Sequence, residues 1–98
     1  MIEITEYKDG VSIKGHAGYA PHGQDIVCAA ISALTQTFIM SVEQLAGDEI
    51  KYVLMAGNTD IWLKKDLSET TNVLFKSFLI GCNAVANAYP NNIQVTKR

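Results

Sequence analysis

Residues 10–47 read GVSIKGHAGYAPHGQDIVCAAISALTQTFIMSVEQLAG, and this stretch decides the fold. It opens with apolar Val11 and Ile13 alternating with polar residues, which is the pattern of a strand. The next ten residues, 15–24, contain three glycines and one proline, which predicts a loop. Residues 26–45 have neither Gly nor Pro and are rich in Ala, Leu, Ile, Met and Gln, which predicts a helix of about five turns. The sequence therefore predicts a strand, a loop and a helix in direct succession.

The flanking segments supply the remaining elements. Residues 2–7 alternate as a strand and join the next strand through a turn at Asp9-Gly10. After Gly47 ends the first helix, residues 50–55 and 59–65 predict a second hairpin with Gly57-Asn58 in its turn. A second helix begins at Ser68 and stops at Pro90, and a last strand contains Ile93 and Val95. The order β-β-α-β-β-α-β predicts an α+β fold with a mixed or antiparallel sheet packed against two helices.

Length and charge limit the classes of function. A chain of 98 residues fits a single domain, 1–98. The net charge is −2 and no basic stripe is visible, so direct nucleic-acid binding is not expected. Polar residues interrupt every apolar stretch short of the ~20 needed to span a bilayer, and the N-terminus lacks the pattern of a signal peptide. We therefore expect a cytoplasmic protein with reduced thiols and no membrane attachment.

The first helix carries apolar residues on more than one side. Leu34, Phe38 and Leu45 lie on one side, and Ile39 and Met40 lie on others. A helix that is apolar on several sides needs cover on several sides. In a domain of this size, that pattern hints at a homodimer.

Cys28 is the candidate nucleophile. If Asp25 is the N-cap of the first helix, Cys28 occupies the third helical position, beside unpaired backbone N–H groups at the positive end of the helix dipole. This position favours the thiolate, the nucleophilic form of cysteine. The same N–H groups are expected to stabilise an oxyanion formed when the thiolate attacks a carbonyl.

Two histidines in the preceding loop are candidate bases. His16 follows a strand end directly, so the sheet should hold it firmly, whereas His22 lies in mid-loop and should be more mobile. A catalytic base must be positioned closely, which favours His16. Residues 18–24 then form a flexible flap over the site, with Gly18 and Gly23 as hinges.

Three alternatives compete with this interpretation. A cysteine on an Ala-rich helix is commonly a small core residue, as we expect for Cys82 on the apolar stripe of the second helix, Leu74, Phe78, Cys82, Val85 and Tyr89. A structural zinc site would use His16, His22, Cys28 and Cys82, but their spacing matches no standard zinc pattern, and we expect no metal and no cofactor. A non-enzymatic ribosome-assembly or RNA-binding module would need a basic face.

The run GHA at 15–17 followed by GQDIVCAAIS at 23–32 resembles the signature of the ribosomal-processing cysteine protease (Prp) family. The resemblance covers the whole chain in length and element order. It implies a homodimeric cytoplasmic endopeptidase that removes a short N-terminal extension from a large-subunit ribosomal protein, cutting after paired aromatic residues. It assigns His16 and Cys28 as catalytic and Asp25 and Ser32 as supporting residues. The loop sequence at 19–22 is individual to this chain.

Overall fold

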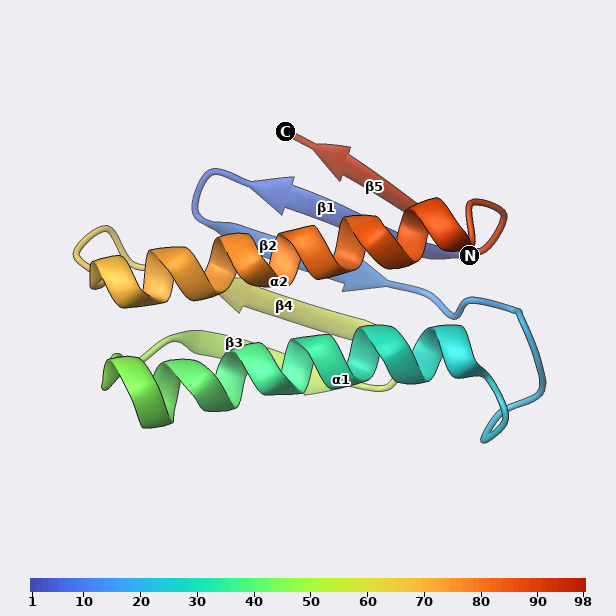
Figure 1. The fold of residues 1–98 in the computed structure, drawn as a ribbon, viewed down its shortest axis with the longest axis horizontal. Coiled ribbons are helices and arrows are strands. Elements are labelled where there is room, and N and C mark those ends of the chain that lie inside the picture. Colours follow the sequence, from blue (N-terminus) through green and yellow to red (C-terminus); the bar gives the residue numbers. More distant parts are fainter.

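A computed structural model describes all 98 residues, and its elements follow the predicted order (Figure 1). The strands and helices, in chain order, are β1 (Ile2–Tyr7), β2 (Gly10–Lys14), α1 (Ile26–Ser41), the π-helical turn η1 (Val42–Ala46), β3 (Lys51–Met55), β4 (Asn58–Trp62), α2 (Glu69–Ala88) and β5 (Ile93–Lys97). The predicted α+β fold with the order β-β-α-β-β-α-β is confirmed.

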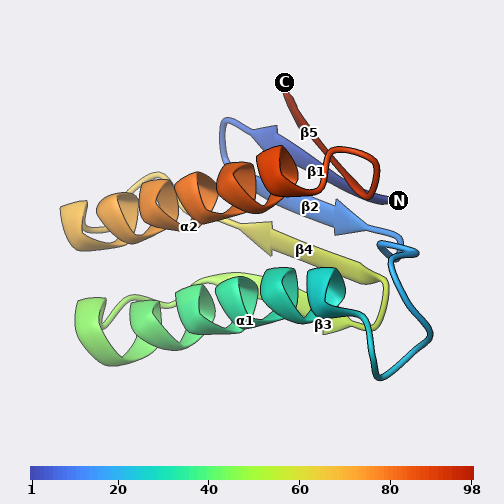
Figure 2. The ribbon, with the colours of Figure 1, turned by 45° about the vertical axis from the view of Figure 1, so that its right-hand side comes forward.

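The five strands form one mixed sheet in the order β3-β4-β2-β1-β5. The neighbouring strands are antiparallel except β1 and β5, which pair in parallel with Ile4 opposite Val95. Both helices cover the same face of this sheet (Figures 1 and 2). The molecule therefore has two layers, and the other face of the sheet carries no helix.

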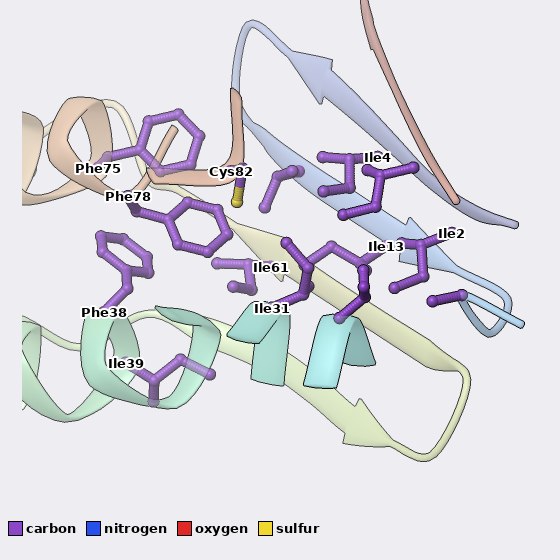
Figure 3. Packing of buried hydrophobic residues seen from close by; sticks show 14 of the residues in the cluster. Ile2, Ile4, Ile13, Ile31, Phe38, Ile39, Ile61, Phe75, Phe78 and Cys82 are labelled. Atoms are coloured by element: carbon purple, nitrogen blue, oxygen red, sulfur yellow. The ribbon is translucent and has the colours of Figure 1, made fainter. Parts of the chain in front are cut away.

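The core lies between the two helices and the covered face of the sheet (Figure 3). Phe38 of α1 packs against Phe75 and Phe78 of α2, with ring centroids 5.6 and 5.4 Å apart. Cys82 is fully buried in this core, as the helical spacing predicted. Burial raises the pKa of the Cys82 thiol to about 12, so this cysteine stays protonated and unreactive.

Several boundaries differ from the prediction. The α-helical part of the first helix ends at Ser41, and η1 continues it to Gly47, whose φ of 68° supplies the left-handed cap that ends the segment. Strand β4 spans Asn58–Trp62, so Asn58 lies in the strand and residues 63–65 lie beyond it. The turn between the first two strands falls one residue earlier than predicted, and Gly10 belongs to β2.

The segment Ile26–Ala46 is long and apolar enough to cross a membrane by length and composition alone, with a mean hydropathy of 1.6. Polar residues interrupt this segment, as expected, yet its average composition is apolar enough to meet that criterion. Val27, Ile31 and Phe38 of the same helix are buried in the core. A core helix meets the same criterion of length and composition, so the segment is weak evidence for a membrane span.

Candidate active site

An open groove of about 680 Å³ runs along the start of α1 and the hairpin formed by β3 and β4. Its lining includes His16, Asp25, Cys28 and Ser32 from the predicted site, and Leu54 and Met55 from β3. The start of α1, the end of β2 and the β3–β4 turn all lie at one end of the molecule (Figures 1 and 2). The fold thus brings both candidate catalytic residues to one surface groove.

Cys28 lies in the first turn of α1, half-buried, with its sulfur accepting a hydrogen bond from a backbone N–H. The donor is Ala17, the residue after His16, and the N···Sγ distance is 3.3 Å. A backbone donor at this position stabilises negative charge on the sulfur. The same contact ties the loop that carries His16 to the residue that carries the thiol.

Asp25 is the N-cap of α1, as predicted, and its two carboxylate oxygens have different partners. Oδ1 accepts hydrogen bonds from the N–H groups of Val27 and Cys28, both at 3.0 Å. Oδ2 accepts from the N–H groups of Tyr19 and Ala20 in the loop, at 3.0 and 3.3 Å. The Cys28 N–H, with those of Ala20, Tyr19 and Val27, lowers the pKa of Asp25, although desolvation of the carboxyl opposes the shift.

This capping changes the expected oxyanion site. The N–H of Cys28 was expected to be free for an oxyanion, but it donates to Asp25, as does the N–H of Val27. The N–H of Ala29 is used within the helix. The Ala17 N–H is also occupied, since it donates to the Cys28 sulfur, and it becomes available to a reacting carbonyl oxygen only when attack removes the negative charge from that sulfur.

The loop before α1 is held at three further points. The Asn92 side chain donates a hydrogen bond to the Ala17 carbonyl at 2.9 Å. Tyr19 packs edge-to-face on Tyr89 at the end of α2, with ring centroids 5.4 Å apart. The Gly15 N–H donates to the Gly57 carbonyl at 3.0 Å. His16 thus lies on a segment anchored to the end of α2, to the turn before β5 and to the β3–β4 turn.

Sequence reasoning missed Asn92, Tyr89 and Gly57. The first two lie 75 and 70 positions from their loop partners, and no local pattern connects residues that far apart. Gly57 was assigned only to a turn. Its left-handed φ of 72° was foreseeable from the turn, but its proximity to His16 was not.

The other predicted residues lie around the groove without direct contacts to the thiol. Ser32 is one turn after Cys28, but its hydroxyl accepts a hydrogen bond from Gln36 at 2.9 Å. His22 is exposed in a tight turn closed by the hydrogen bond from Gln24 N–H to the Pro21 carbonyl. Gly18 and Gly23 have positive φ angles of 68° and 86°, and a side chain there would meet open space.

The structure does not gather the four possible zinc ligands. Cys82 is enclosed in the core, whereas Cys28 lines the groove. No group of three or more His, Cys, Asp or Glu side chains is arranged to hold a metal ion. The geometry gives the zinc alternative no support.

A thiol at a helix start and a loop histidine that line the same open groove are the groups that a thiol-dependent hydrolase needs. The family model described as cysteine protease Prp matches residues 1–94. The chain therefore belongs to the Prp family of cysteine proteases.

Individual relatives agree with this assignment. A ribosomal processing cysteine protease Prp from Mycoplasma genitalium is 34% identical over 98 residues, covering 99% of this chain and 96% of the relative. The protein of the same name from Bacillus subtilis is 26% identical over 84% of this chain and 79% of its own. These relatives support the protease over the RNA-binding alternative.

Solved structures share the fold. The ribosomal processing protease Prp from S. aureus, in complex with a covalently linked product peptide, superposes with a TM-score of 0.89 at 20% identity, over 99% of this chain and 97% of that one. A protein from Streptococcus mutans matches with a TM-score of 0.76 at 28% identity, over 98% and 90% of the two chains. The two-layer architecture is therefore that of Prp structures.

Proposed function

We propose that this protease removes a short N-terminal extension from a large-subunit ribosomal protein in the cytoplasm, with Cys28 as nucleophile and His16 as base. The observation that carries the proposal is the hydrogen bond from the Ala17 N–H to the Cys28 sulfur, since it brings the residue after His16 onto the thiol. The names of the Mycoplasma and Bacillus relatives support ribosomal processing. The open groove beside the thiol suits an extended peptide.

The proposed reaction is covalent acyl transfer. The Cys28 thiolate attacks the scissile carbonyl carbon, and the Ala17 N–H donates a hydrogen bond to the resulting oxyanion. The tetrahedral intermediate collapses as His16 gives a proton to the leaving amine. His16 then takes a proton from a water molecule, which attacks the thioester. This second step releases the N-terminal extension and restores the free thiolate.

Asp25 and Ser32 are proposed as supporting residues. Asp25 holds the loop and the helix start together, so it fixes the distance between the segments of His16 and Cys28. Ser32 and Gln36 form a polar pair on the groove wall, one and two turns beyond the thiol. Leu54 and Met55 offer an apolar wall for the paired aromatic residues expected before the cut.

The test is cleavage of a peptide that carries the N-terminal extension and the first residues of the mature ribosomal protein. Wild type and Cys82→Ala should cleave it, and Cys28→Ser should not, because a hydroxyl is a much weaker nucleophile than a thiolate. Mass spectrometry identifies the cut and circular dichroism checks that the variants are folded. Equal cleavage by Cys28→Ser would refute the assignment of the nucleophile. Cleavage of a control peptide with the same residues in scrambled order would refute the assigned substrate.

A further inference from the structure

The turn between β3 and β4 lies directly against the His16 imidazole. A side chain at Gly57, in this turn, would begin with a Cβ atom only 2.7 Å from Nε2 of His16 and 3.1 Å from Cε1. Contacts under 3.0 Å do not occur for real Cβ atoms, so one of the two groups would have to move. Glycine at this position therefore lets the ring lie against the backbone.

The backbone holds Gly57 in place relative to His16. The Gly57 carbonyl accepts the Gly15 N–H, and β2 pairs with β4 so that Lys14 lies opposite Asn58. The Lys14 ammonium bonds the Asn58 side chain and forms an ion pair with Asp60 at 2.8 Å. Both the residue before His16 and the residue after Gly57 are thus fixed in one hydrogen-bonded ladder.

No hydrogen bond orients the ring itself. The His16 side chain neither donates to nor accepts from any group of the protein. In many enzymes a third side chain performs that role for the catalytic histidine. Here the Gly57 backbone lies so near the ring that a Cβ atom built on it would be 2.7 Å from Nε2.

We propose that Gly57 is a positioning residue for His16. Its backbone, which has no side chain, limits where the imidazole can lie relative to Cys28. The proposal rests on the proposed role of His16 as base. A displacement of a reacting group by about 1 Å can lower a rate by about 10²-fold. A methyl group at Gly57 imposes a displacement of that order on the ring.

The chain supplies a matched control at Gly47. The φ angles of Gly57 and Gly47 are 72° and 68°, so alanine is strained alike at both. A Cβ at Gly47 would meet nothing within 4 Å. Gly57→Ala should lower kcat by about 10²-fold with little change in KM, and Gly47→Ala should leave turnover within about threefold. Equal effects of the two variants would overturn the proposal.

A second readout does not depend on turnover. In NMR spectra of the two imidazoles, Gly57→Ala should shift the ring signals of His16, while His22 serves as the internal reference. Gly47→Ala should move neither histidine. An unchanged His16 ring in Gly57→Ala would overturn the proposal, even if activity fell.

Removing the ring should remove the effect. In a His16→Ala background the added methyl group has space, so Gly57→Ala should cost no further turnover and should lower Tm less than it does with His16 present. The Tm comparison applies even if Gly57→Ala folds poorly. Equal Tm losses in both backgrounds would overturn the proposal. Full turnover in the single variant His16→Ala would instead refute the role of His16 as base. The NMR signals of the His16 ring in Gly57→Ala would still decide whether Gly57 positions the imidazole.

Discussion

At the scale of single residues, the two cysteines occupy opposite environments. Cys28 is half-buried, lines the groove and accepts a backbone hydrogen bond at its sulfur. Cys82 has no exposed surface, and burial raises the pKa of its thiol to about 12. One chain therefore contains a thiol that a reagent or substrate can reach from the groove and a thiol used as a small apolar core residue.

We expect a small alkylating reagent to label Cys28 in the folded protein near neutral pH. Cys82 should react only after denaturation, because burial both excludes the reagent and disfavours its thiolate. Mass spectrometry of briefly treated native protein locates the label. Denatured protein, in which both cysteines react, is the control. Preferential labelling of Cys82 in the native protein would contradict the assignment of the reactive thiol.

The two histidines should differ in their contribution to turnover. His16→Ala should reduce peptide cleavage by about 10²–10⁴-fold, which is the usual contribution of general acid–base catalysis. His22→Ala should have a small effect: both histidines are exposed and line the groove, but His22 lies in a separate turn, whereas His16 directly precedes the Ala17 N–H that donates to the Cys28 sulfur. Steady-state kinetics of both variants decides the matter, and a larger loss at His22 would reverse the choice of base.

At this scale the sequence predicted the residues whose roles follow from local position. Asp25 and Cys28 were foreseeable because a cap and the first helical turn are set by neighbours along the chain. Ser32 was assigned a supporting role only by the family resemblance, and its hydroxyl accepts a hydrogen bond from Gln36, one further turn along the helix. Gly57 and Asn92 were missed, since their contacts to the loop depend on which strands pair in three dimensions.

At the scale of elements, the junction between the loop and α1 depends on one carboxylate. Oδ1 of Asp25 accepts hydrogen bonds from N–H groups of the helix, and Oδ2 accepts them from N–H groups of the loop. A single side chain therefore sets the angle at which the loop enters the helix. The two functions can be separated by substitution. Asparagine keeps an oxygen able to cap the helix but has no second acceptor for the loop, whereas alanine lacks both.

Asp25→Asn should therefore lower Tm less than Asp25→Ala does, because it keeps the helix cap but loses the charge and two loop hydrogen bonds, and the loosened loop should lower turnover. Asp25→Ala should lower Tm as well, by roughly 5 °C for the loss of a helix cap in a domain of this size. Hydrogen exchange of the Tyr19 and Ala20 amides checks the loop directly. Protection of these amides in Asp25→Asn equal to that in wild type would contradict the assigned role.

The same carboxylate predicts a dependence on pH. Because folding lowers the pKa of Asp25 below its ordinary value of 3.8, its stabilisation is fully present above that value and is lost as the pH falls through the lower, folded value. The pKa of Asp48 is also lowered, chiefly by the Ser68 hydroxyl, so both groups contribute to acid sensitivity. The difference between the acid unfolding curves of wild type and Asp25→Asn isolates the part due to Asp25.

Element boundaries followed the sequence where a local signal exists. Ser68 caps α2, and Tyr89, just before Pro90, ends it, as predicted. The π-helical turn Val42–Ala46 was not foreseen, because its residues are ordinary helix formers and only the hydrogen-bond pattern distinguishes it. The choice between a mixed and an antiparallel sheet was also left open, because strand order depends on contacts between distant segments.

At the scale of the whole molecule, β3 is an edge strand with no partner on its outer side. All five of its residues are exposed, among them four consecutive large apolar side chains: Tyr52, Val53, Leu54 and Met55. An exposed apolar edge of this kind is a template for pairing with another chain. We propose that it forms the contact between two copies in a homodimer.

Light scattering should accordingly give twice the 10.7 kDa mass of one chain. Val53→Lys should shift the protein toward the monomer, because a charge on an edge strand opposes pairing. Val73→Lys is the matched control, since Val73 is also exposed but lies on α2. A monomeric wild type, or equal dissociation of the two variants, would contradict this assembly.

The parallel pairing of β1 with β5 joins two segments that are synthesised far apart in time. Residues 2–6 are made long before residues 93–97, so these strands cannot pair until the later one has left the ribosome. Asn92, which holds the Ala17 carbonyl, emerges just before β5. We therefore expect the loop that carries His16 to be fastened only after Cys28 has been made, and full peptidase activity to follow the pairing of β5 with β1.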